Sequence, residues 1–74
     1  MSSVVNIAAY KFVTLSDLPG LRASMLDRCR SLDIKGTILL TEEGINLFLA
    51  ATQAGIDSFL QWLRADAKFA DLEV

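Results

Sequence analysis

The chain has 74 residues, a net charge of −2, one cysteine and no histidine. One small domain fits this length, and the residue counts exclude a zinc site of four His or Cys ligands, an internal disulfide, and Ser–His–Asp or Cys–His catalysis. A hydrophobic share of 53% argues against disorder, and a pI of about 4.8 argues against a free-standing nucleic-acid binder.

The first predicted element is a strand over residues 4–13, VVNIAAYKFV, which is rich in β-branched and aromatic residues. Both of its faces are largely apolar, as is typical of a central strand. One face holds Val5, Ile7, Ala9 and Lys11, and the other holds Val4, Ala8, Tyr10 and Phe12.

A helix is predicted next. Ser16 or Asp17 can accept the free N–H groups of its first turn, and Pro19 has no N–H to leave unpaired there. We expect the helix to end near Asp33, with Gly36 shortly after. Apolar residues recur at steps of three and four, which predicts one buried face: Leu18, Leu21, Met25, Cys29 and Leu32.

Two strands follow as a predicted antiparallel hairpin, over residues 36–41 and 45–51. Glu42, Glu43 and Gly44 form the tight connection between them, and Gly44 can supply a residue with positive φ. The carboxylates of neighbours on a turn usually diverge, so we expect Glu42 to be solvated or to contact a partner rather than to form an acid–base pair, and Glu43 stays open.

A second helix is predicted to begin at Thr52, a good N-cap residue. Its apolar face has helical spacing, with Trp62 at one margin. Residues 69–74 alternate again and are predicted to begin a fourth strand. The helix buries Ile56, Phe59, Leu60 and Leu63.

The element order is therefore β-α-β-β-α-(β), which predicts an α+β fold of the ferredoxin-like, split βαβ type. Right-handed crossovers place both helices on one face of the antiparallel sheet. The other face is then open or covered by a partner. The fourth strand is expected to be truncated at residue 74.

Cys29 lies on the apolar face of the first predicted helix, so we interpret it as a core residue rather than a nucleophile. A lone cysteine fits a reducing, cytoplasmic compartment. No apolar run approaches the ~20 residues that span a bilayer, and the first residues do not resemble a signal peptide.

Aromatic residues occur on two strands expected to be neighbours: Tyr10 and Phe12 on the first, and Phe48 on the third. Some RNA-binding modules stack bases on aromatics in such positions. Because the RNP-type run of those modules is absent here, a core or a domain interface is the favoured interpretation.

Lys11 and Lys35 are candidate phosphate contacts, although long amines commonly extend to water. Asn46 is more informative, because an amide in an apolar strand must be satisfied or exposed to a partner. Acylphosphatase activity, which this fold raises, is not expected. The loop over residues 14–20 lacks the arginine and the glycine pair of that enzyme's phosphate cradle.

Three segments occur together and in order: AYKF over residues 9–12, KGTILL over 35–40 and EEGIN over 42–46. This combination resembles the N-terminal domain of the rhodanese-domain tRNA uridine hydroxylases, formerly uncharacterised rhodanese-related proteins. Residues 59–66 and 69–74 are similar to the same family, so the resemblance covers essentially the whole chain.

The resemblance implies that residues 1–74 form one N-terminal, ferredoxin-like domain of a larger protein whose rhodanese domain is absent here. Members of the family use molecular oxygen as co-substrate to convert the wobble uridine of certain tRNAs to 5-hydroxyuridine. Their essential cysteine lies in the rhodanese domain, and Cys29 does not match it. The resemblance therefore implies no catalytic residue, metal or cofactor in this chain.

Two hypotheses follow. In the first, this domain orients tRNA for a cytoplasmic oxidoreductase, with tRNA and the rhodanese domain as partners, no membrane contact and room for a homo-oligomer. In the second, it is a structural module of a rhodanese-type, sulfurtransferase-like protein, packed on the rhodanese domain or a second copy without touching RNA. The residues expected to contact RNA or a partner are Tyr10, Lys11, Lys35, Glu43 and Asn46.

Overall fold

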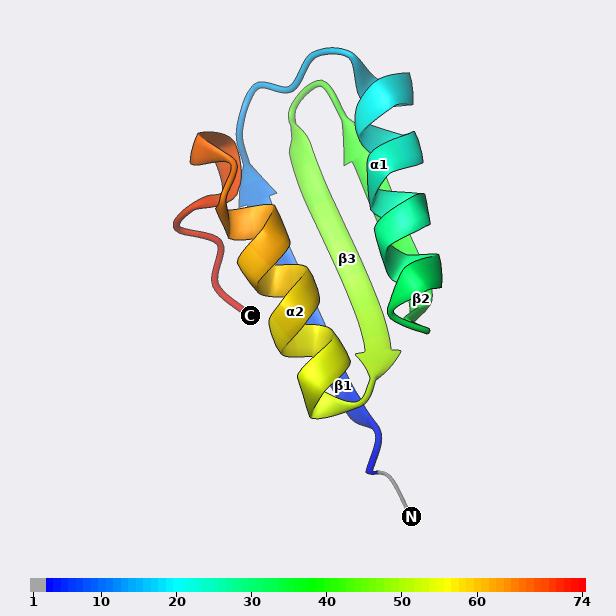
Figure 1. The fold of residues 1–74 in the computed structure, drawn as a ribbon. Helices are drawn as coiled ribbons and strands as arrows, with labels where there is room; N and C mark the ends of the chain where they lie inside the picture. The colour runs from blue at the N-terminus through cyan, green and yellow to red at the C-terminus, as the bar shows by residue number, and fades with distance from the viewer. Residues whose placement is uncertain (1–2) are drawn as a thin grey trace.

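The computed structural model describes residues 3–74. Both predicted helices and three of the predicted strands are present, within one or two residues of the expected bounds (Figure 1). The elements are β1 (Val5–Phe12), α1 (Leu18–Ser31), β2 (Lys35–Thr41), β3 (Gly44–Ala51), α2 (Gln53–Arg64) and the 3₁₀ helix η1 (Ala67–Phe69).

The three strands form one antiparallel sheet in the order β1-β3-β2. Figure 1 shows both helices on the same face, with α1 over β2 and α2 over β1. This arrangement confirms the α+β, ferredoxin-like prediction. The expectation of a central first strand is wrong for the part of the chain that the structure describes, because β3 is central and β1 lies at an edge.

The strand register decides which side chains face the helices. Leu47 in β3 pairs with Ala9 in β1 and Ile38 in β2, and this row faces the helices. Side chains alternate along a strand, so the next row, Ala8, Phe48 and Thr37, faces away.

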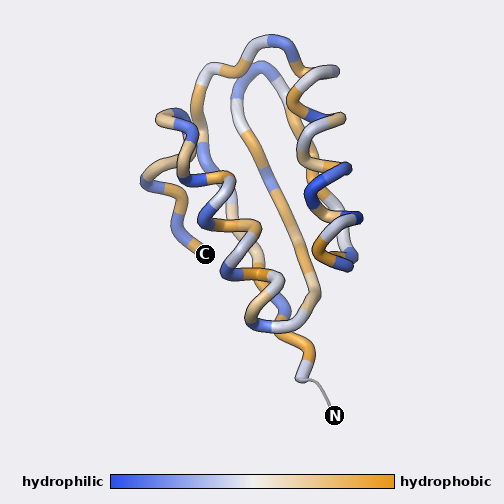
Figure 2. Tube along the Cα trace, in the orientation of Figure 1, coloured by the Kyte–Doolittle hydropathy of each residue, from blue (hydrophilic) through white to orange (hydrophobic). Residues whose placement is uncertain are grey.

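The core lies between β3 and the two helices, where Figure 2 shows apolar positions following the strands and the inner sides of the helices. Its largest fully buried side chains come from four elements of the fold. They are Phe59, Phe69, Met25, Leu47 and Ile56.

The two helices begin differently. Thr52 caps α2 as predicted, since its Oγ1 accepts a hydrogen bond from the Gly55 amide at 3.1 Å. Asp17 holds the N-cap position of α1, but its side chain makes no capping hydrogen bond and its backbone is left-handed, with φ 50°. The prediction of a side-chain cap there is therefore wrong. The end of α1 comes before Asp33, where another left-handed residue, φ 54°, turns the chain towards β2.

Residues 69–74 do not form the predicted fourth strand. Phe69 ends η1, and the chain turns there, with the Leu72 amide donating to the Phe69 carbonyl at 3.0 Å. Both side chains are buried. A spacing of three residues places them on the same side of a 3₁₀-type turn, whereas a strand would put them on opposite faces.

The β2–β3 hairpin has a two-residue loop between the paired residues Thr41 and Gly44. This loop is fastened to the chain after β1, because the Val13 and Leu15 amides donate to the carbonyls of Glu43 and Glu42, at 3.0 and 3.1 Å. The turn therefore lies beside the end of β1. Within residues 3–74, neither helix is long and apolar enough to cross a membrane.

Candidate functional site

The sheet face that the helices leave uncovered, called the open face here, carries large exposed apolar side chains. Tyr10, Phe12, Phe48 and Leu39 are 71%, 82%, 52% and 54% exposed. These side chains are therefore not part of this domain's core. A core position was one of the alternatives expected for the aromatic residues. The face comprises Asn6, Ala8, Tyr10, Phe12, Lys35, Thr37, Leu39, Thr41, Gly44, Asn46, Phe48 and Ala50.

A hollow of about 300 Å³ lies on this face near the hairpin. We call it the Gly44 hollow, because the central strand presents no side chain between Phe12 and Thr41. Gly44 has φ 156°, and a Cβ added to it would run into the Lys11 carbonyl oxygen. Glycine is therefore required by the backbone, and the gap on the face follows from it.

Two aromatic rings form one wall of the Gly44 hollow. Tyr10 and Phe12 lie edge to face, with ring centroids 6.0 Å apart and an interplanar angle of 72°. Leu39 lines the opposite side, on β2. Such a wall offers apolar contact and aromatic faces to a flat ligand.

Polar groups complete the lining of the hollow. Asn46 is exposed on the central strand, so its amide is open to a partner. Glu43 contributes an exposed carboxylate from the turn. The Thr41 hydroxyl accepts a hydrogen bond from the Glu43 amide at 3.2 Å, which fixes the turn. The hollow can thus accept hydrogen bonds from a ligand and donate to it.

The structure brings together four of the five predicted contact residues, since the lining of the Gly44 hollow includes Tyr10, Lys11, Glu43 and Asn46. Lys35 lies on the same face at the far end of β2, paired with Ala50. That is four residues from the position opposite Asn46, or about 13 Å along a strand.

Lys11 is part of the lining of the hollow, but its ammonium lies away from the open face. Its Nζ donates to the Lys68 carbonyl at 2.8 Å and forms an ion pair with the Asp71 carboxylate. Hydrogen bonding to this ammonium and attraction to its charge lower the pKa of Asp71. Lys11 therefore fastens the C-terminal segment, residues 67–74, against β1.

Five lining residues were not among the expected contacts: Phe12, Leu39, Thr41, Gly44 and Ile45. The sequence of the hairpin was sufficient to predict two of these, Leu39 and Gly44. A two-residue loop between Thr41 and Gly44 fixes the register and places Leu39 opposite Asn46.

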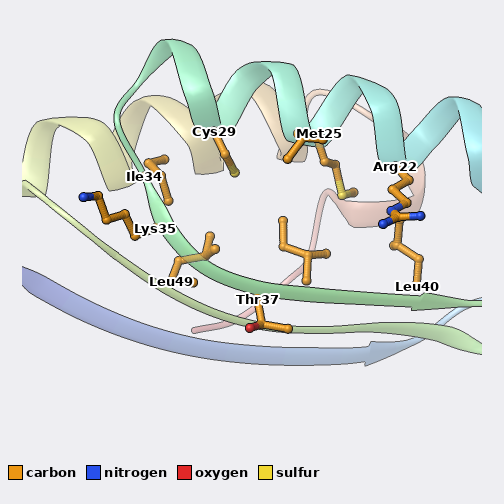
Figure 3. Close-up of a pocket in the computed structure, with 11 residues that line it drawn as sticks. Arg22, Met25, Cys29, Ile34, Lys35, Thr37, Leu40 and Leu49 are labelled. Carbon is orange, nitrogen blue, oxygen red and sulfur yellow. The ribbon is translucent and has the colours of Figure 1, made fainter.

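A second hollow, the α1–β2 groove, lies between helix α1 and strand β2 and has a volume of about 290 Å³ (Figure 3). Cys29 and Met25 point from α1 towards the sheet there. Burial raises the pKa of the Cys29 thiol, which keeps it protonated and unreactive at neutral pH. Among residues 3–74, no three His, Cys, Asp or Glu side chains gather where a metal ion could bind.

The family model for the UPF0176 acylphosphatase-like domain matches residues 4–74. The chain belongs to this family. Within this UPF0176 domain, the Gly44 hollow lies on the open face and the α1–β2 groove lies between helix α1 and strand β2.

Three relatives of this UPF0176 domain carry the same name. The chain is 63% identical over 73 residues to the tRNA uridine(34) hydroxylase of Bordetella petrii, covering 99% of this chain and 29% of that protein. It is 58% identical over 69 residues to that of Cupriavidus necator, covering 93% and 24%, and 56% identical over 73 residues to that of Bordetella pertussis, covering 99% and 30%. The chain thus spans 24–30% of the length of these relatives.

Proposed function

We propose that this chain acts as the N-terminal domain of a cytoplasmic tRNA uridine(34) hydroxylase and holds tRNA on its open face. The observation that carries this proposal is the Gly44 hollow, in which two exposed aromatic rings meet an amide and a carboxylate. The names of the relatives support tRNA as the substrate.

In this proposal the oxidation takes place elsewhere in the larger protein. Oxygen-dependent conversion of uridine 34 to 5-hydroxyuridine is assigned to a rhodanese domain in cis. Cys29 packs in the core with a raised pKa, so this chain's part is to bind and orient the substrate.

An unpaired nucleobase is the part of tRNA that fits the hollow. Stacking of a base on a protein aromatic ring contributes about 1–3 kcal/mol, whatever the base. The Asn46 amide can both donate to and accept from a base edge, and the Glu43 carboxylate can accept from a base N–H. Lys35, on the same face, would meet a phosphate further along the strand.

The experiment measures tRNA affinity in a full-length hydroxylase that carries this domain. Tyr10→Ala should weaken binding roughly 5- to 150-fold, the equivalent of one lost stacking contact. Leu26→Ala is the matched control, because Leu26 is 45% exposed on α1, away from the open face. Unchanged affinity in Tyr10→Ala would contradict the proposal.

Lys35 gives a second, independent readout. Removing one phosphate contact lowers the slope of log affinity against log salt by about 0.7–0.9. We expect this for Lys35→Ala but not for Lys68→Ala, which changes an exposed lysine in η1 that is not part of the open face. Equal slopes in both variants would remove Lys35 from the proposed interface.

One observation favours a second candidate function, that of a structural module. Of the twelve positions on the open face, only Lys35 is charged, and an exposed apolar patch of this kind is typical of a protein interface. If the face packs on the rhodanese domain instead, Tyr10→Ala will lower the melting temperature of the full-length enzyme and leave its tRNA affinity unchanged.

A further inference from the structure

The backbone that carries Glu43 beside the Gly44 hollow is fastened on both sides of its peptide. The Glu43 amide donates to the Thr41 hydroxyl at 3.2 Å, and the Glu43 carbonyl accepts from the Val13 amide at 3.0 Å. The exposed Glu43 side chain therefore extends from a fixed turn at the hollow. A fixed attachment reduces the ordering entropy that is lost when the side chain binds a ligand.

Glu43 also supplies the charge that a ligand in the hollow would meet. Two charged residues line the hollow, Lys11 and Glu43. The Lys11 ammonium is bound to the Lys68 carbonyl and the Asp71 carboxylate, and within residues 3–74 no lysine or arginine forms an ion pair with Glu43. Because a carboxylate repels phosphate, Glu43 weakens RNA binding at this place unless a base donates hydrogen bonds to it.

The chemistry of a carboxylate decides which base can do so. A carboxylate only accepts hydrogen bonds, through two oxygen atoms that lie side by side. Among the RNA bases, guanine presents two adjacent donors on its Watson–Crick edge, N1–H and the 2-amino group. In adenine and cytosine the amino group lies next to a bare ring nitrogen, and in uracil N3–H lies between two carbonyl oxygens. With these three bases, one carboxylate oxygen would face an acceptor.

We propose that the Gly44 hollow selects guanine among the unpaired bases of tRNA, an inference that rests on the proposed function of the open face. The guanine ring stacks on the wall formed by Tyr10 and Phe12, and its two donors bind the two oxygens of Glu43. Charge-assisted, bidentate pairs of this kind are among the strong hydrogen-bonded contacts. The Asn46 amide both donates and accepts, so it suits any base, and the discrimination comes from Glu43.

The test measures how tightly a full-length hydroxylase with this domain binds heptaribonucleotides of uridine that differ only in the central base. Fluorescence anisotropy at one salt concentration gives each affinity. We expect the heptamer with central guanine to bind roughly tenfold tighter than those with adenine, cytosine or uracil, within the range of one bidentate base contact. A central inosine keeps N1–H but lacks the 2-amino group, so this heptamer should lose most of the preference.

Glu43→Gln is the diagnostic variant, and Glu42→Gln is its matched control. Both remove one negative charge from the same turn, but Glu42 does not line the hollow. Glu43→Gln replaces one acceptor by a donor, so its affinity for the guanine heptamer should fall relative to the others, whereas Glu42→Gln should keep the preference. Wild type binding every heptamer alike, binding none of them, or showing a preference that both variants change equally would each overturn guanine selection.

Tyr10→Ala separates this inference from the proposed function. It should weaken every heptamer by a similar factor, because stacking on an aromatic ring does not depend on the base. If it does so while wild type shows no guanine preference, guanine selection fails and the proposed function stands. If Tyr10→Ala leaves every affinity unchanged, both fail. Tyr10, Glu42 and Glu43 are exposed, so the variants should fold, which circular dichroism verifies.

Discussion

Leu47 and Phe48 are neighbours on β3 that face opposite ways, and they allow the two faces of the sheet to be compared at one place in the chain. Leu47 is fully buried under the helices, whereas Phe48 is 52% exposed on the open face. Truncation to alanine at these two positions should therefore have very different costs in folding free energy.

The cost at position 47 combines lost burial with a new cavity. Burying a leucine side chain contributes about 1.5–3 kcal/mol, and a cavity that the surroundings do not fill raises the cost of Leu→Ala to about 2–5 kcal/mol. A domain of 74 residues has a total stability of roughly 4–11 kcal/mol, so Leu47→Ala should remove a large share of it. Phe48→Ala loses mainly cross-strand contacts, about 0.2–1 kcal/mol.

Urea denaturation followed by circular dichroism measures both costs, with equal m-values as the check that the two variants unfold alike. If Phe48→Ala destabilises the chain as much as Leu47→Ala, the open face is not open, and the assignment of the Gly44 hollow to a ligand loses its basis.

Three further predictions concern single contacts. Thr52→Ala removes the hydroxyl that accepts a hydrogen bond from the Gly55 amide. It should lower the free energy of unfolding by about 1 kcal/mol and the melting temperature by roughly 4–8 °C. No change in a thermal melt would mean that the cap does not stabilise α2. The lowered pKa of Asp71 means that its ion pair with Lys11 stabilises the fold above the ordinary pKa of 3.8 and that this contribution is lost as the pH falls through the folded-state value. Stability curves of wild type and Lys11→Met should therefore converge in acid, and a constant gap would refute this coupling. Cys29, buried with a raised pKa, should react with a thiol reagent slowly in the native chain and rapidly in denaturant; equal rates would place it at the surface.

Hydrophobic spacing in the sequence was sufficient to predict the order of the first five elements and the buried helix faces. The steps of three and four along both helices determine which helix face is buried. The residues at these steps are buried or half-buried, as with Met25 and Phe59. The spacing over residues 69–74 is ambiguous, because Phe69 and Leu72 are too few to fix a period. The structure resolves it as a turn that buries both residues.

Local pattern alone could not establish where the apolar residues of β1 face. Two apolar faces are typical of a central strand, yet Tyr10 and Phe12 are exposed. Which face the helices cover depends on crossovers between distant segments, and those are not encoded in the strand itself. The position of the Lys11 ammonium could not be predicted for the same reason, because its partners Lys68 and Asp71 lie more than fifty residues away in the sequence.

The proposal that tRNA occupies the open face is tested most directly by a photo-crosslinking amino acid in place of Tyr10 in a full-length hydroxylase, irradiated in the presence of tRNA. Tyr10 is 71% exposed at the wall of the Gly44 hollow, so a reactive group there reports what lies against the face. The account predicts a covalent protein–tRNA product that excess unlabelled tRNA competes away. Crosslinks formed only within the polypeptide, unchanged by tRNA, would contradict it.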